Sequence, residues 1–172
     1  EIQINQQGNR GRTALHTAVW GIEGGREGKK VGSGSKDDCP EAAKLLLEAG
    51  ADVNIQDHDG NTPLAVACST YAERSLPLLL AFGADPFIVN NNGETPLFQA
   101  SRLGFVPICK LLLNNSKSDP FITNKDNRDC FEISIINRHY ELVLFYVDYL
   151  SEKLATDLQY FDNIIHLVAT HF

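Results

Sequence analysis

The segment Asp85-Pro86-Phe87-Ile88-Val89-Asn90 recurs almost unchanged 34 residues later, as Asp119-Pro120-Phe121-Ile122-Thr123-Asn124. Internal similarity at a fixed period of about 20 to 50 residues is typical of solenoids, in which small structural units stack on one another. Because each unit contacts only its neighbours, such proteins usually bind partners on the extended surface of the stack. The sequence therefore directs the search for function to a binding surface.

The same period extends over most of the chain. When each unit is aligned on the apolar residue that anchors its first helix, the aligned positions are Leu15, Leu64, Leu97 and Phe131, with Ile165 as a candidate fifth. The intervals between these positions are 49, 33, 34 and 34 residues. Since only the first interval is long, we expect the first unit to carry an insertion of about 16 residues.

Three copies of one motif carry a resemblance to a known family. The segments 60–67 (Gly-Asn-Thr-Pro-Leu-Ala-Val-Ala), 93–100 (Gly-Glu-Thr-Pro-Leu-Phe-Gln-Ala) and 11–18 (Gly-Arg-Thr-Ala-Leu-His-Thr-Ala) resemble the Gly-x-Thr-Pro-Leu-His-x-Ala signature of ankyrin repeats. Segments 45–54 and 78–85 resemble the end of the family's second helix. The resemblance implies an all-α repeat solenoid of paired antiparallel helices joined by β-hairpin loops, with about four repeats plus a partial fifth repeat or C-terminal cap.

We expect residues 1–172 to form a single ankyrin-repeat domain. Its predicted parts are 4–54 with an insertion at 21–39, then 55–87, 88–121, 122–155 and 156–172. The last part has two interpretations. Residues 163–169 match the first helix of a fifth repeat truncated at the end of the sequence, whereas a capping helix would cover the last apolar face of the stack.

Capping and turn residues predict where the helices begin and end. Thr62 and Thr95 can cap the helices that follow them. The proline after each threonine suits the first helical position, because proline has no N–H to leave unpaired there. Gly50 and Gly83 follow the second helices, where a left-handed residue ends a helix and turns the chain outward.

Two departures from the repeat pattern lead to specific expectations. The fourth repeat replaces the turn glycine with Asn127, a residue type that tolerates left-handed backbone, and it keeps a capping side chain at Asp129. Pro77 is out of register with Pro107 of the third repeat. We therefore expect the second helix of repeat two to begin late, with irregular backbone from Tyr71 to Pro77.

Composition excludes several classes of protein. The chain is 43% hydrophobic and 22% charged, which is sufficient for a folded core. Its net charge of −7 argues against a nucleic acid partner, because that affinity comes from clustered Lys and Arg. No apolar run approaches the roughly 18 residues that span a membrane, and residues 1–20 lack the pattern of a secretory signal.

The four cysteines are dispersed and have no metal-ligand spacing. They are Cys39, Cys68, Cys109 and Cys130. We interpret them as reduced thiols, two of which fall in repeat helices where they pack as small apolar residues. The expectation is a monomer in the cytoplasm, with the nucleus as the alternative, and no cofactor or metal.

The insertion at 21–39 is rich in glycine, serine and charged residues, which predicts a flexible loop. Its Gly28-Lys29-Lys30 lacks the first glycine and the Ser or Thr of a phosphate-binding P-loop, so nucleotide binding is not supported. One interpretation is a tolerated surface excursion between the two helices of repeat one. The other is a partner contact through a basic patch of Arg26, Lys29 and Lys30.

The resemblance implies that partners are held by the hairpin tips and by the exposed face of the first helices, which together line a concave groove. By position, the tip residues are Asn9, Arg10 and Arg12; His58, Asp59 and Asn61; Asn91, Asn92 and Glu94; and Lys125, Asp126 and Arg128. The helix positions are Trp20, Ser69, Thr70, Arg102, Leu103, Ile136 and Asn137.

Trp20 and Arg102 are the predicted hot spot, because aromatic and arginine anchors dominate interface energetics. The alternative for Trp20 is packing under its own insertion. For any single tip residue the alternative is the ordinary polarity of a solvent-exposed turn.

No set of candidate catalytic residues converges in the sequence. His16 occupies the histidine of the signature, where the resemblance implies a hydrogen bond between neighbouring repeats, while His58 lies on a tip and His139 on a turn between helices. The prediction is a non-catalytic module that binds another protein or another domain of the same polypeptide. The alternative is a substrate-targeting or regulatory arm of a larger multidomain enzyme or effector whose catalytic domain lies outside this chain.

Overall fold

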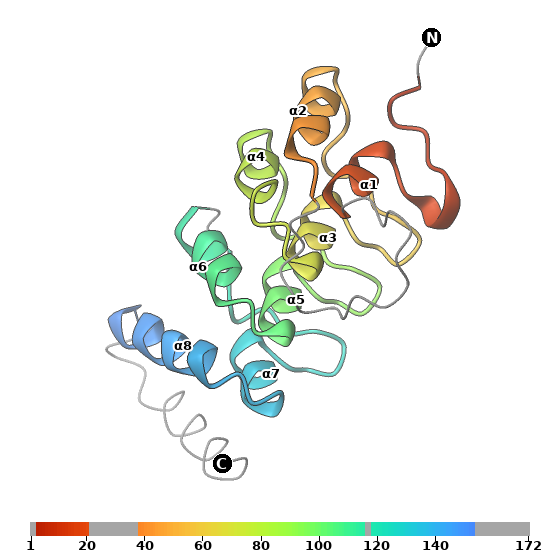
Figure 1. Ribbon diagram of the computed structural model, residues 1–172. Helices are drawn as coiled ribbons and strands as arrows, with labels where there is room; N and C mark the ends of the chain where they lie inside the picture. The colour runs from red at the N-terminus through yellow and green to blue at the C-terminus, as the bar shows by residue number, and fades with distance from the viewer. Residues whose placement is uncertain (1–2, 21–37, 116–117, 154–172) are drawn as a thin grey trace, which may run out of the picture.

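Four antiparallel helix pairs stack side by side in the computed structural model, which describes residues 3–20, 38–115 and 118–153 (Figure 1). The helices are α1 (Ala14–Trp20), α2 (Pro40–Glu48), α3 (Pro63–Thr70), α4 (Leu76–Ala81), α5 (Pro96–Leu103), α6 (Val106–Asn115), α7 (Cys130–Ile136) and α8 (Tyr140–Lys153). A short 3-10 turn, η1 (Asn9–Gly11), precedes α1. The all-α repeat solenoid predicted from the sequence is confirmed.

The odd-numbered helices form an inner row and the even-numbered helices an outer row. Helices α1, α3, α5 and α7 contact one another in that order, and each packs against the outer helix of its own repeat. Between repeats, loops project from one side of the stack (Figure 1). The predictions for most of the insertion and for residues 156–172 lie outside the described residues.

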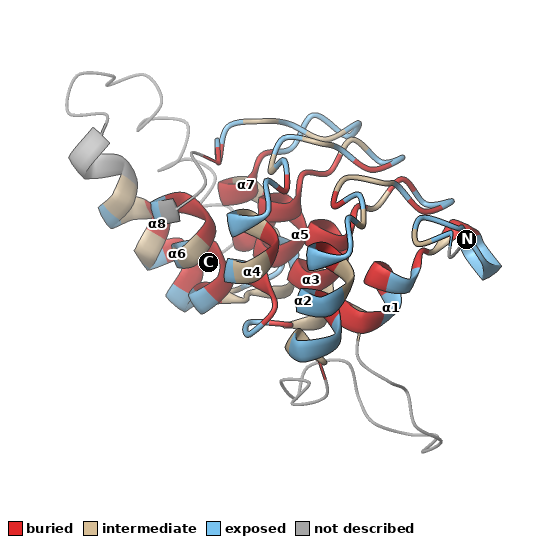
Figure 2. Ribbon diagram, turned by 90° about the horizontal axis from the view of Figure 1, so that it is seen from above, coloured by how far each residue is buried: buried red, intermediate tan, exposed pale blue. Residues whose placement is uncertain are grey.

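The core runs along the stack between the two rows. The residues aligned on the period, Leu15, Leu64, Leu97 and Phe131, are at most 1% exposed. Figure 2 shows the buried residues concentrated on the inner helices, with exposed residues on the loops and the outer row. The residues that recur every 33 or 34 positions are therefore core residues of successive repeats.

Side-chain caps fix where the inner helices begin. The Thr62 hydroxyl accepts a hydrogen bond from the Ala65 N–H at 3.3 Å, and the Thr95 hydroxyl accepts one from the Phe98 N–H at 3.2 Å. Asp129 forms a reciprocal capping box with Glu132. These contacts confirm the predicted caps.

Left-handed residues end helices and form the tight turns where they were predicted. Gly50, Gly83 and Asn127 have φ values of 89°, 84° and 58°. The inner helices α3, α5 and α7 are also followed by left-handed residues, at Tyr71 and Gly104 directly and at Arg138 one residue further on. Only glycine adopts this backbone without a steric cost, so the sequence alone did not indicate the tyrosine.

Helix α4 begins late, as predicted. It starts at Leu76, whereas the equivalent helix α6 starts at Val106, three positions earlier in the 33-residue register. Pro77 occupies the second helical position, where its missing N–H leaves no helical bond unmade. The chain from Tyr71 to Ser75 forms irregular turns instead.

Candidate protein-binding groove

The four loop tips, residues 9–12, 58–61, 91–94 and 125–128, are joined into one continuous edge by backbone hydrogen bonds. The His58 N–H donates to the Arg10 carbonyl at 2.9 Å, the Asn91 N–H to Asp59 at 3.0 Å, and the Lys125 N–H to Asn92 at 3.0 Å. Each tip is closed by its own backbone bond, although no β-strand is formed among the described residues. We call the space between this edge and the last turns of the inner helices the groove.

A polar cavity of about 280 Å³ lies in the middle of the groove, between tips two and three. It is lined by Asp59, Asn61, Ser69, Asn90, Asn91, Asn92, Glu94, Gln99 and Arg102. Side-chain amides and hydroxyls both donate and accept hydrogen bonds, so this lining suits the backbone or polar side chains of another protein.

Amide side chains bridge repeats two and three beneath this cavity. The Asn61 Oδ1 accepts hydrogen bonds from Asn90 Nδ2 at 3.2 Å and from Gln99 Nε2 at 2.7 Å. Asn90 also donates to the carboxylate of Glu94 at 3.1 Å. The Oε1 atom of Gln99 is buried without a hydrogen bond, which leaves one acceptor unused in the floor of the cavity.

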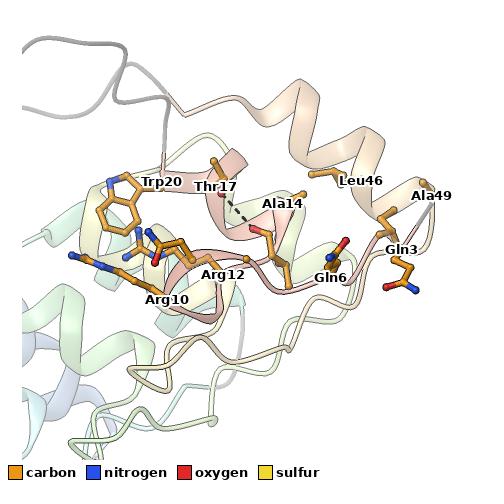
Figure 3. A pocket seen from close by; sticks show the side chains of 13 residues that line it. Gln3, Gln6, Arg10, Arg12, Ala14, Thr17, Trp20, Leu46 and Ala49 are labelled. Carbon is orange, nitrogen blue, oxygen red and sulfur yellow. Dashed lines mark hydrogen bonds between the residues drawn. The ribbon is translucent and has the colours of Figure 1, made fainter. Parts of the chain in front are cut away.

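A second cavity, of about 1140 Å³, lies at the N-terminal end of the stack and extends from the first tip to α2. Figure 3 shows Arg10, Arg12 and Trp20 grouped at one end of it and Leu46, Ala49 and Gln3 at the other. The Arg12 guanidinium stacks over the Trp20 ring, 3.3 Å from the ring centroid, and its Nε lies 3.7 Å from the Asp57 carboxylate. Burial lowers the pKa of Arg12, an effect that the nearby Asp57 opposes.

The structure groups most of the predicted partner-binding residues along this groove. The exposed tip residues are Asn9, Arg10, His58, Asp59, Asn91, Asn92, Lys125, Asp126 and Arg128. On the floor, Trp20 and Ile136 are half-buried and the Arg102 side chain is 44% exposed. Trp20 packs on Arg12 of its own repeat.

Glu94 and Asn61 differ from the expectation for tip residues. Glu94 is only 7% exposed, and its carboxylate is held by Asn90 and lies 3.7 Å from the Nε of Arg102. Asn61 is half-buried and its amide oxygen joins repeats two and three. Both side chains are held inward by these hydrogen bonds, whereas Arg128 at the same position of repeat four is exposed.

Gln99, Asn90 and Asp57 belong to the groove but were not singled out from the sequence. All three are buried polar residues. Gln99 occupies the helix position that carries Thr17, Val66 and Ile133 in the other repeats. Because this position holds both polar and apolar residues, the sequence alone did not indicate the hydrogen bond of Gln99.

His16 has the structural role implied by the family signature. Its Nε2 lies 3.0 Å from the Asn61 carbonyl of the next repeat, and its Nδ1 lies 3.2 Å from the Thr13 amide nitrogen. Because a carbonyl only accepts and an amide N–H only donates, Nε2 carries the proton and Nδ1 is the acceptor. Burial lowers the pKa of His16, which favours this neutral form.

The described residues show no other chemistry of the kind that a catalytic or metal site needs. Cys68, Cys109 and Cys130 are buried, and burial raises the pKa of Cys109 to about 12, so this thiol is unreactive. No group of three or more His, Cys, Asp or Glu side chains that could hold a metal ion occurs in the part of the chain described. No helix there is long and apolar enough to cross a membrane.

Comparison with known proteins gives both a family match and individual relatives. A family model for ankyrin repeats, in three copies, matches residues 34–126 and 71–157. The zebrafish (Danio rerio) protein fem-1 homolog A is 39% identical over 70 residues, which are 40% of this chain and 10% of that protein. The chicken (Gallus gallus) NF-kappa-B inhibitor alpha is 36% identical over 73 residues, which are 42% of this chain and 18% of that protein. The similarity therefore spans less than a fifth of the length of either relative.

Proposed function

The chain belongs to the ankyrin-repeat family, and from that premise we propose that it is a non-catalytic module that binds a partner protein in its groove. Ankyrin repeats are in general protein-interaction modules. One relative is by name an inhibitor of another protein, NF-kappa-B, which supports a regulatory binding role.

The observation that carries the proposal is the continuous groove itself. Its tips are tied to one another by backbone hydrogen bonds, and its floor is fixed by the amide contacts between Asn61, Asn90 and Gln99. A rigid surface loses little conformational entropy when a partner binds, which favours affinity. The exposed side chains on it include arginine and a partly exposed tryptophan, the residue types that dominate interface energetics.

An enzymatic role would need a nucleophile, a base and an orienting group within hydrogen-bond reach. In the described part of the chain, the ring nitrogens of His16 are hydrogen-bonded to Thr13 of its own repeat and to Asn61 of the next repeat, and His139 contacts the Arg102 carbonyl at 2.9 Å. The proposal therefore assigns no catalytic residue. We further propose that the chain is a monomer and that it lies in the cytoplasm, with the nucleus as the alternative compartment.

Affinity capture from cell lysate with three versions of the chain tests this proposal. The groove variant is Trp20→Ala, Arg102→Ala, and the control is Lys44→Ala, Glu48→Ala, which removes an exposed ion pair of α2 on the opposite row. Both variants must first show a thermal unfolding midpoint close to that of the parent. We expect a partner retained by the parent and the control and lost by the groove variant; equal retention by all three contradicts binding in the groove.

A second candidate follows from the relatives, which extend well beyond the aligned region. In this alternative the repeats are the substrate-targeting or regulatory arm of a larger multidomain enzyme or effector. The captured protein distinguishes the two: a substrate modified only in the presence of the full-length native protein supports the alternative, and an unmodified complex supports the simple binding module.

A further inference from the structure

The groove holds an arginine guanidinium at equivalent places in repeats one and three. The tip residue before each capping residue is followed, eight positions later, by a residue at the end of the inner helix. In repeat one these two residues are Arg12 and Trp20, and in repeat three they are Glu94 and Arg102. In repeat one the tip arginine lies over the helix tryptophan, 3.3 Å from the ring centroid. In repeat three the helix arginine lies 3.7 Å from the tip carboxylate. A guanidinium thus occupies the space between tip and helix in both repeats.

Each of these guanidinium groups lies beside a buried carboxylate. The side chain of Asp57, next to Arg12, is 1% exposed, and that of Glu94, next to Arg102, is 9% exposed. The arginine side chains are 21% and 44% exposed. The guanidinium groups are therefore accessible to a partner in the groove, whereas the carboxylates beside them are buried and restrict the arginine rotamers. An ordered guanidinium binds a carboxylate through two parallel hydrogen bonds.

Charged residues of both signs lie on the tips and on the inner helices beside them. Among the described residues there, five are basic: Arg10, Arg12, Arg102, Lys125 and Arg128. The exposed carboxylates there are those of Asp59 and Asp126. By contrast, exposed acidic residues such as Glu41, Glu48, Glu141 and Asp148 lie on the outer row. When the buried Asp57 and Glu94 are counted as well, five basic side chains face four carboxylates, so these residues carry a net charge of +1 in a chain of net charge −7.

We propose that the partner presents an extended acidic segment, in which two Asp or Glu side chains bind Arg12 and Arg102. This inference rests on the proposed function and names the chemistry of the partner. The contacting helices α1, α3 and α5 are spaced by about 8 to 10 Å each, so the two sites lie roughly 16 to 20 Å apart. Since an extended chain advances about 3.3 Å per residue, the two acidic residues are about five or six positions apart.

Selection of a displayed library of random 12-residue peptides on the immobilised chain tests this inference. We expect the selected pool to be enriched in pairs of Asp or Glu five or six positions apart. Fluorescence anisotropy of a selected peptide should then show about a tenfold weaker affinity when either acidic residue is changed to Gln. Arg12→Gln and Arg102→Gln should each cause a similar loss, whereas the control variant Arg74→Gln, on the turn before α4, should bind like the parent.

Four results would overturn the inference. One is a basic or purely apolar consensus in the selected pool, and another is acidic peptides whose affinity is unchanged in both groove variants. The third is tighter binding of a labelled single-stranded DNA than of the acidic peptides. A pool without enrichment in acidic pairs overturns the extended acidic segment. Groove binding is tested separately by the capture experiment. The failure of one proposal is therefore distinguishable from the failure of the other.

Discussion

The guanidinium of Arg12 lies over the ring of Trp20, with 3.3 Å between the guanidinium carbon and the ring centroid. This contact joins the first tip to the last turn of α1. It also orders both side chains before a partner arrives, because each restricts the rotamers of the other. Trp20, the predicted hot spot, thus packs on a tip residue of its own repeat.

Replacing Trp20 with Ala should weaken peptide binding by about tenfold, because an arginine that has lost its aromatic support is less ordered. Trp20→Phe keeps a ring beneath the guanidinium and should lose less than about threefold. Isothermal titration calorimetry with a selected peptide measures both affinities. Equal losses of affinity for the two variants would show that an aromatic ring beneath the guanidinium does not contribute to peptide binding.

Replacing Leu112 with Ala should lower the free energy of unfolding by about 2 to 5 kcal/mol, since Leu112 is 0% exposed and its truncation leaves a cavity in the core. Urea unfolding followed by circular dichroism measures the change. The exposed Leu45, at 68%, provides the control, and Leu45→Ala should change stability by less than about 0.5 kcal/mol. Similar effects at both positions would contradict the register of the repeats.

Asn127 carries a left-handed backbone at the turn of repeat four, with φ of 58°. Asn127→Ala should destabilise the chain by about 1 kcal/mol, because alanine tolerates this conformation less well than asparagine. Asn127→Gly should stay within about 0.5 kcal/mol of the parent, as glycine gains conformational freedom in both states. The same unfolding assay checks both changes; a neutral alanine variant would argue against a strained turn.

Acidification should destabilise the fold through His16. Its pKa is lowered in the folded state, so below the unfolded pKa of about 6.5 the unfolded chain binds a proton that the folded chain does not. The free energy of unfolding should then fall by up to about 1.4 kcal/mol per pH unit from this group, until the pH reaches the folded pKa.

The control for this pH dependence is His16→Gln, which should be less stable at neutral pH but should lose less stability between pH 6.5 and 5. Chemical unfolding at a series of pH values gives both curves. Parallel curves for the parent and the variant would assign the acid sensitivity to other groups.

Much of the fold could be predicted because its determinants are local. The caps at Thr62 and Thr95 and the turns at Gly50 and Gly83 each depend on one residue type at one position, which the period repeats. The late start of α4 could likewise be predicted from Pro77. Tyr71 could not, since a bulky residue adopts left-handed backbone only when its surroundings compensate, here through edge-to-face packing on Phe105.

The groove was harder to predict because side-chain direction depends on the neighbouring repeat. The tip position before the capping threonine holds Arg12 over Trp20 in repeat one and a buried Glu94 in repeat three. Sequence position alone treats these residues as equivalent. Which of them reaches a partner depends on hydrogen bonds across repeats, such as those of Asn61 and Asn90, that no single repeat contains.

Site-specific photo-crosslinking tests whether the partner binds in the groove. A benzophenone amino acid is placed at His58 or Asn92 on the tips, and at Lys44 or Arg74 on or beside the outer row, all of which are exposed. After irradiation in cells, denaturing gels and mass spectrometry identify the adducts. We expect a shared partner adduct from His58 and Asn92 and none from Lys44 and Arg74; an adduct formed only from the outer positions would contradict groove binding.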